Sequence, residues 1–125
     1  LAKEGRPINY GASVNWANAR IATFLDKTPS YELDWFFAAF NEPIWQKTIS
    51  TDEQLAKILA MVQQGLDEGG LGVGFLLGYA PGTGRKEYYR VSELAAENAR
   101  ATFTHARFLS VLEPESSFEA MAEIV

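Results

Sequence analysis

The stretch STDEQLAKILAMVQQGLDEGGLGVGFLL (residues 50–77) decides the fold class, because it joins a well-marked helix directly to a strand. Ser50 and Glu53 match the capping box with which many helices begin. Thr51 and Gln54 match the same pattern one residue later. The sequence therefore predicts a helix that begins at one of these two caps.

This predicted helix carries one apolar stripe and ends at the pair Gly69–Gly70, which tolerates the positive φ of a helix end. The stripe follows helical spacing and consists of Leu55, Ile58, Leu59, Val62 and Leu66. The apolar run over 71–77 that follows has the length of a strand. In that strand Gly72, Gly74 and Leu76 share one face. The glycines either leave room for a ligand or only relieve crowding in the core.

Similar patterns predict the rest of the chain as an alternation of strands and helices. The expected elements are a short strand at about 7–12, helices over 14–24 and 30–40, a loop over 78–84, a helix over 86–98, a strand over 100–105 and a helix over 117–125. Such alternation favours βα units around a parallel sheet. We therefore expect an α/β fold, with residues 1–125 forming about three βα units of a (β/α)8 TIM-type barrel.

Composition excludes several classes of protein. The 125 residues fit one domain, and the hydrophobic fraction of 47% is typical of a globular one. The net charge is −5 and the basic residues are scattered, so we expect no nucleic-acid partner. No apolar run has the length of a membrane helix, which argues against a membrane partner. The absence of cysteine excludes disulfides and agrees with a reducing compartment, so we expect a cytoplasmic location.

Two glycine-rich segments resemble nucleotide-binding motifs but fail on their spacing. GVGFLLG (72–78) is one residue longer than the dinucleotide fingerprint, and its first glycines lie inside the predicted strand. In GYAPGTGRKE (78–87), Lys86 is followed by Glu87 where a P-loop has Ser or Thr. An alternative function uses the loop over 78–86 to bind an anionic ligand in a small, self-contained, non-enzymatic module.

Three polar residues follow the predicted strands. Tyr79 opens the loop after one strand, where it either binds substrate through its hydroxyl or packs on the next helix. His105, the only histidine, ends the next strand, where it is either a metal ligand or base or an ordinary polar residue. Alternation places Arg107 on the same side as His105 if the strand continues. One histidine cannot complete a zinc site by itself.

Two segments together resemble the metal-dependent amidohydrolase superfamily, in the branch of D-aminoacylases and N-acyl-D-amino-acid deacylases. The carrying motifs are Gly70-Leu71-Gly72, Tyr79-Ala80-Pro81-Gly82, Glu93-Leu94-Ala95 and Thr104-His105-Ala106-Arg107, in that order. The resemblance covers nearly the whole chain and is greatest to the N-acyl-D-glutamate deacylase type. It implies a zinc-dependent hydrolase that cleaves the amide bond of N-acyl-D-amino acids within a (β/α)8 barrel.

The same resemblance assigns roles to three residues. His105 matches the family's metal-binding histidine, Tyr79 matches the substrate-contacting tyrosine, and Arg107 matches the arginine of the same motif, with a substrate-binding role. The family's H-x-H pair, its Cys-containing strand end, its second zinc histidine and its catalytic Asp have no counterpart here. We therefore expect an inactive internal fragment without a catalytic residue of its own, which the remainder of the same polypeptide completes.

Overall fold

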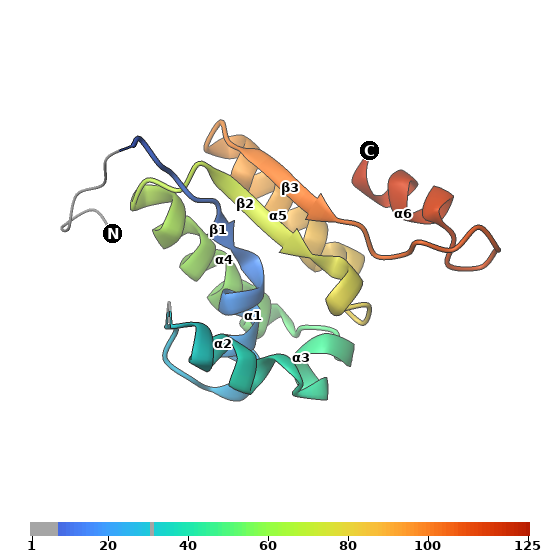
Figure 1. The fold of residues 1–125 in the computed structure, drawn as a ribbon, viewed down its shortest axis with the longest axis horizontal. Helices are drawn as coiled ribbons and strands as arrows, with labels where there is room; N and C mark the ends of the chain where they lie inside the picture. The colour runs from blue at the N-terminus through green and yellow to red at the C-terminus, as the bar shows by residue number, and fades with distance from the viewer. Residues whose placement is uncertain (1–7, 31) are drawn as a thin grey trace.

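The computed structural model describes residues 8–30 and 32–125 as a mixed α/β fold around a small parallel sheet (Figure 1). The strands are β1 (Val14–Asn15), β2 (Gly72–Leu76) and β3 (Ala101–His105), in the order β1-β2-β3. All pairs are parallel, with Asn15 opposite Gly74, Gly74 opposite Phe103, and Leu76 opposite His105. The carboxyl ends of the strands therefore meet at one edge of the sheet.

Helices cover one face of this sheet. The helices are α1 (Trp16–Leu25), α2 (Leu33–Phe40), α3 (Pro43–Lys47), α4 (Asp52–Asp67), α5 (Arg85–Glu97) and α6 (Ser117–Ile124), with a short 3-10 helix η1 (Leu77–Tyr79) after β2. In Figure 1, α4 and α5 lie behind the strands, and no helix of the described ranges crosses the front of the sheet. We call this uncovered side the open face. Within residues 8–30 and 32–125, no helix combines the length and apolar character needed to cross a bilayer.

The predicted alternation of side chains in β2 is confirmed by burial. Val73 and Phe75 are fully buried against the helices, whereas Leu76 is only half-buried and faces the open side. The predicted helix after Ser50 is also confirmed, and the capping box is the one made by Thr51 and Gln54. The apolar stripe of this helix packs into the core, as the burial of four of its five members shows: Leu55, Ile58, Val62 and Leu66.

The strand expected at about 7–12 is wrong in its position. Residue 7 lies outside the described residues, and residues 8–12 form no strand. The strand is β1 instead, since Val14 pairs with Val73 near the start of β2. Asn15 then caps α1 by accepting a hydrogen bond from the Ala17 backbone N–H, which ends the strand after two residues.

Two further elements differ from their prediction. The short helix α3 was not expected; it begins at Pro43, whose fixed φ suits a first helical turn as well as a helix end. The predicted helix at 117–125 is present as α6, but its expected apolar stripe is not buried. Phe118 is 82% and Met121 55% exposed, and Ala120 is the residue of α6 that is buried. Figure 1 shows α6 at the side of the molecule, beyond the end of β3.

Candidate functional site

The carboxyl edge of the sheet brings His105 and Tyr79 together. His105 is the last residue of β3 and lies opposite Leu76, the last residue of β2. After Leu76 the chain turns through η1, which brings the ring of Tyr79 close to the imidazole of His105. The two ring centroids are 5.0 Å apart and the ring planes are inclined at 42°. Both side chains are exposed. The pair therefore lies at the edge where parallel α/β folds place their binding residues.

Gly78 makes this approach possible. A Cβ atom at residue 78 would lie 2.5 Å from Nδ1 of His105 and 2.8 Å from the Ala106 carbonyl oxygen, closer than real Cβ contacts. The imidazole Nδ1 also lies 3.3 Å from that same carbonyl oxygen. In the tautomer protonated at Nδ1, this nitrogen donates to Ala106 and Nε2 keeps its lone pair for a metal ion or a proton.

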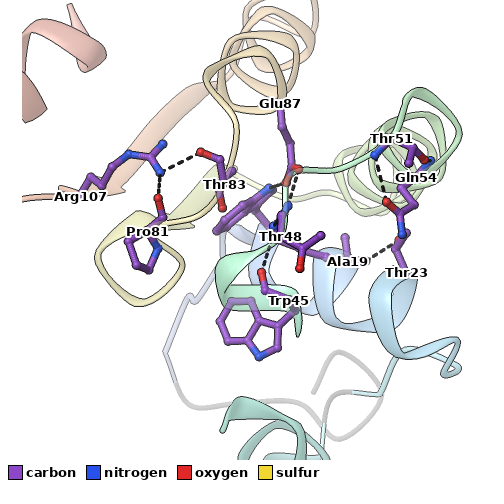
Figure 2. A network of polar contacts seen from close by, with 12 residues as sticks. Ala19, Thr23, Trp45, Thr48, Thr51, Gln54, Pro81, Thr83, Glu87 and Arg107 are labelled. Atoms are coloured by element: carbon purple, nitrogen blue, oxygen red, sulfur yellow. Dashed lines mark hydrogen bonds and ion pairs between the residues drawn. The ribbon is translucent and has the colours of Figure 1, made fainter. Parts of the chain in front are cut away.

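Arg107 fixes the loop that carries Tyr79. Its guanidinium donates to the backbone carbonyl oxygens of Pro81 and Thr83, at 2.6 and 2.8 Å (Figure 2). From the other side, Gly82 donates its N–H to the Gln46 carbonyl oxygen at 2.9 Å. The loop over 78–84 is thus held between the end of β3 and α3, and its conformation is set before any ligand binds.

Arg107 also reaches α6, where it forms a two-point ion pair with Glu123. The Nε–Oε2 distance is 2.9 Å and the NH2–Oε1 distance is 2.7 Å, with both side chains 5% exposed. Four hydrogen bonds leave at most one of the five guanidinium N–H groups for a substrate. The structure therefore brings Tyr79 and His105 together and places Arg107 as a structural link between the loop and α6.

The Gly-rich loop turns several of its polar groups inward. The N–H groups of Gly82 and Thr83 both donate within the protein, to the carbonyl oxygens of Gln46 and Ala80. Lys86, which belongs to the loop expected to bind an anion in the alternative function, places its Nζ 2.5 Å from the exposed carboxylate of Asp52 on α4. An anion cradle needs backbone N–H groups that point at the ligand, and these two do not.

A buried charge pair next to this loop is not foreseen from the sequence. Arg20 on α1 and Glu87 on α5 form an ion pair with both side chains fully buried. Glu87 also accepts a hydrogen bond from Trp16 Nε1 at 2.9 Å, and Arg20 donates to the carbonyl oxygens of Trp45 and Thr48. Figure 2 shows Glu87 pointing from α5 towards Thr48 and Trp45.

Burial lowers the pKa of Arg20 from its ordinary value, and Arg107 adds a smaller push in that direction, while Glu87 opposes both. The signal that would have found this pair is a charged residue on the apolar stripe of a helix. Arg20 falls one turn after the buried Trp16 and Ala17 on α1, and Glu87 falls one turn before Val91 on α5.

The described residues contain one candidate metal ligand rather than a full metal site. Across 8–30 and 32–125, no three His, Asp or Glu side chains converge as a metal site requires. The imidazole of His105 has the right chemistry for zinc, and Nε2 is free of the backbone contact that Nδ1 makes. The residues present therefore fit the contribution of a single ligand, and a complete zinc site would need further ligands besides them.

Comparison with protein-family models, with curated proteins and with solved structures finds no match for this chain.

Proposed function

We propose that this chain forms part of a (β/α)8-barrel hydrolase that cleaves the amide bond of N-acyl-D-amino acids with the help of zinc. Within it, His105 is a metal ligand and Tyr79 contacts the substrate. The observation that carries the proposal is the placement of His105 beside Tyr79 at the carboxyl edge of a parallel sheet, over a glycine that leaves the imidazole room. The resemblance of the sequence to amidohydrolases supplies the reaction.

The open face supports the barrel. All-parallel sheets normally have both faces covered, either by helices on each side or by closure into a barrel. Here the helices pack on one face, and on the other Phe103 remains 55% exposed near the centre of β3. In a closed barrel this face becomes the interior, and the edges of β1 and β3 pair with further strands. We propose that other parts of the same polypeptide supply these strands and the remaining zinc ligands.

Each residue of the site has a defined task in this reaction. Zinc, when bound, lowers the pKa of a bound water and polarises the amide carbonyl. His105 would hold the metal through Nε2, because Nδ1 faces the Ala106 carbonyl oxygen. The hydroxyl of Tyr79, on a ring that is 48% exposed, donates to the carboxylate or carbonyl of the substrate. Arg107 keeps the loop of Tyr79 in place.

The proposal is tested by His105→Ala in the whole polypeptide that contains this chain, with zinc content and hydrolysis of N-acetyl-D-glutamate as readouts. We expect loss of one metal ligand to lower the zinc affinity about 10- to 100-fold or more and to abolish turnover. Tyr89→Ala, which removes an exposed aromatic ring from α5, is the matched control and should change neither. Full zinc stoichiometry and full activity in His105→Ala would overturn the proposal.

Tyr79→Phe separates the second role from the first. This change removes the hydroxyl but keeps the ring that packs against His105 and, at 5.3 Å between centroids, against Phe40. We expect normal zinc content with kcat/KM lowered about tenfold, the value of one hydrogen bond to a charged or reacting group. Unchanged kcat/KM would remove Tyr79 from the substrate site.

Zinc-independent binding of inorganic phosphate that requires the 78–86 loop would instead favour the anion-binding module.

A further inference from the structure

The open face contains a hollow to which the proposed function assigns no role. It has a volume of about 520 Å³ and is lined by Ser13, Asn15, Gly74, Leu76, Phe103 and His105, among others. The strand register accounts for this grouping. Asn15, Gly74 and Phe103 form one row across the three strands, and Leu76 and His105 form part of the next row. The hollow therefore begins at the carboxyl edge, which becomes the mouth of a closed barrel, and extends from His105 towards the centre of the sheet.

Gly74 makes the floor of the hollow. It lies at the centre of the row, between Asn15 and Phe103, and has no side chain to fill the space between them. A Cβ atom at this position would have the Ser13 hydroxyl oxygen as its nearest neighbour, at 3.1 Å. A larger side chain at residue 74 would thus occupy the hollow, while the backbone of the sheet itself tolerates one.

Asn15 presents a fixed hydrogen-bond donor at the side of this hollow. Its Oδ1 is already used, because it accepts from the Ala17 N–H at 3.0 Å to cap α1. This bond fixes the orientation of the carboxamide, and its NH2 group has no partner among the described residues. Asn15 lines the hollow, and its NH2 group is therefore available to an acceptor there.

The other walls select a neutral ligand. Phe103 and Leu76 offer apolar surface, and no Lys or Arg is among the described residues that line the hollow. A carboxylate placed there would lose its hydration without gaining a cation, which is unfavourable. A carbonyl oxygen next to a hydrocarbon chain fits better, since the oxygen accepts from Asn15 and the chain covers Phe103.

From this arrangement we infer that the hollow binds the acyl group of an N-acylated amino acid, with the acyl carbonyl oxygen facing Asn15 and the acyl chain lying over Gly74 against Phe103. Gly74 is then the residue that determines which acyl length is accepted. The inference rests on the proposed function for its substrate class. Because His105 also lines the hollow, the acyl oxygen that accepts from Asn15 keeps its second lone pair for a metal ion held there. Binding of the acyl group here does not require zinc.

The experiment measures binding of N-acetyl-, N-butanoyl- and N-octanoyl-D-glutamate to the zinc-free polypeptide by calorimetry. In the wild type, affinity should rise with acyl length, because each buried CH2 contributes about 0.8 kcal/mol. Gly74→Val should weaken the octanoyl compound at least about tenfold and change the acetyl compound less than about threefold. Equal weakening for all three compounds, or none, would overturn the inference.

Two substitutions of Asn15 test the donor. Asn15→Asp and Asn15→Ser both keep an oxygen that caps α1, but each loses the amide donor. We expect both to weaken all three compounds about tenfold, with free D-glutamate unaffected. An effect in Asn15→Asp alone would show charge repulsion rather than a lost donor and would contradict the assignment of Asn15.

A third measurement needs no variant and therefore does not depend on the folding of one. On titration with the octanoyl compound, the amide resonances of Asn15, Gly74 and Phe103 should shift in the wild type, and those of α4 should not. Shifts confined to other surfaces would overturn the inference. If the acyl-length dependence holds while His105→Ala keeps its zinc, the proposed hydrolase fails but the acyl site stands; the reverse result removes the acyl site alone.

Discussion

Gly78 lies directly against His105, so that a Cβ atom at residue 78 would come within 2.5 Å of the imidazole Nδ1. This relationship joins two strands, since residue 78 follows β2 and His105 ends β3. The lack of a side chain at one position therefore sets the ring orientation at the other. If His105 binds a metal ion, the orientation of its imidazole depends on Gly78, which does not itself contact the metal.

Gly78→Ala is predicted to weaken zinc binding without removing a ligand. The new methyl group must displace the imidazole or the Ala106 carbonyl, and either movement turns Nε2 away from its direction in the wild type. We expect zinc affinity to fall about tenfold and the free energy of unfolding to fall by about 1–3 kcal/mol, the usual cost of overpacking. Calorimetric zinc titration and urea unfolding measure the two effects.

Gly84→Ala is the control for this experiment. Its Cβ would meet only the Ile49 side chain, with Cγ2 as the nearest atom at 3.2 Å, and no atom of His105. Zinc affinity should be that of the wild type. The same loss of zinc affinity in both variants would mean that the effect comes from the loop as a whole, and not from the contact with His105.

Arg107 and Glu123 provide a second test, of how the loop over 78–84 is held. Arg107→Ala removes the ion pair and both bonds to the loop carbonyls, and it leaves Glu123 unpaired at 5% exposure. We expect a loss of about 3 kcal/mol in the free energy of unfolding. Glu123→Gln keeps the carbonyl bonds of Arg107 and should cost about 1 kcal/mol.

Hydrogen exchange distinguishes the two variants further. The amide of Gly82, bonded to the Gln46 carbonyl oxygen, should exchange faster in Arg107→Ala and as in the wild type in Glu123→Gln. If the Gly82 amide exchanged equally fast in both variants, and faster than in the wild type, the ion pair with α6 would keep the loop in place, and not the bonds to Pro81 and Thr83.

The ion pair between Asp52 and Lys86 predicts a dependence of stability on pH. The hydrogen bond and charge of Lys86 lower the pKa of Asp52 below its ordinary value of 3.8. A carboxyl group with a lowered native pKa stabilises the fold above the unfolded pKa, and this contribution is lost as the pH falls through the native pKa. The advantage of the wild type over Lys86→Gln should therefore be present at pH 7 and disappear in acid below the native pKa of Asp52.

A carbon-13 titration of the Asp52 carboxyl group checks the cause. In Lys86→Gln its pKa should rise towards 3.8, because both lowering interactions come from the same ammonium group. A pKa of Asp52 that stays low without Lys86 would assign the effect to the helix N-terminus instead.

Local chemistry explains which elements the sequence predicts well. The helix α4 has a cap, a stripe and a glycine end within its own residues, and β2 and β3 lie within one residue of their predicted ends. The strand β1 was misplaced because its position depends on Val73, far along the chain. The helix α3 was missed because Pro43 is compatible with both a helix end and a helix start.

The same distinction between local and long-range information applies to the candidate site. The strand ends identify His105 and Tyr79 as candidates, because their location follows from alternation along one segment. The contact of Arg107 with Glu123 and the hollow over Gly74 depend on which strands and helices meet in space, and a single sequence does not determine that. The same limit applies to Arg20 and Glu87, whose side chains meet across 67 residues.

The Arg20–Glu87 pair gives the last prediction, a double-mutant cycle on a buried network. Arg20→Met leaves the Glu87 carboxylate buried with only Trp16 as a donor, and it also frees the Trp45 and Thr48 carbonyls. Glu87→Leu leaves the guanidinium of Arg20 buried without a counter-charge. We expect each single variant to lose about 3–5 kcal/mol in the free energy of unfolding.

The double variant should lose far less than the sum of the two, because it leaves no unpaired charge in the core. Urea unfolding of the four proteins should give a coupling energy of about 2 kcal/mol or more. Additive losses would mean that the carbonyl bonds of Arg20, rather than its pairing with Glu87, stabilise the connection from α3 to α4. Because Gln46 of α3 also accepts from Gly82, that result would make Arg20 a second support of the loop of Tyr79.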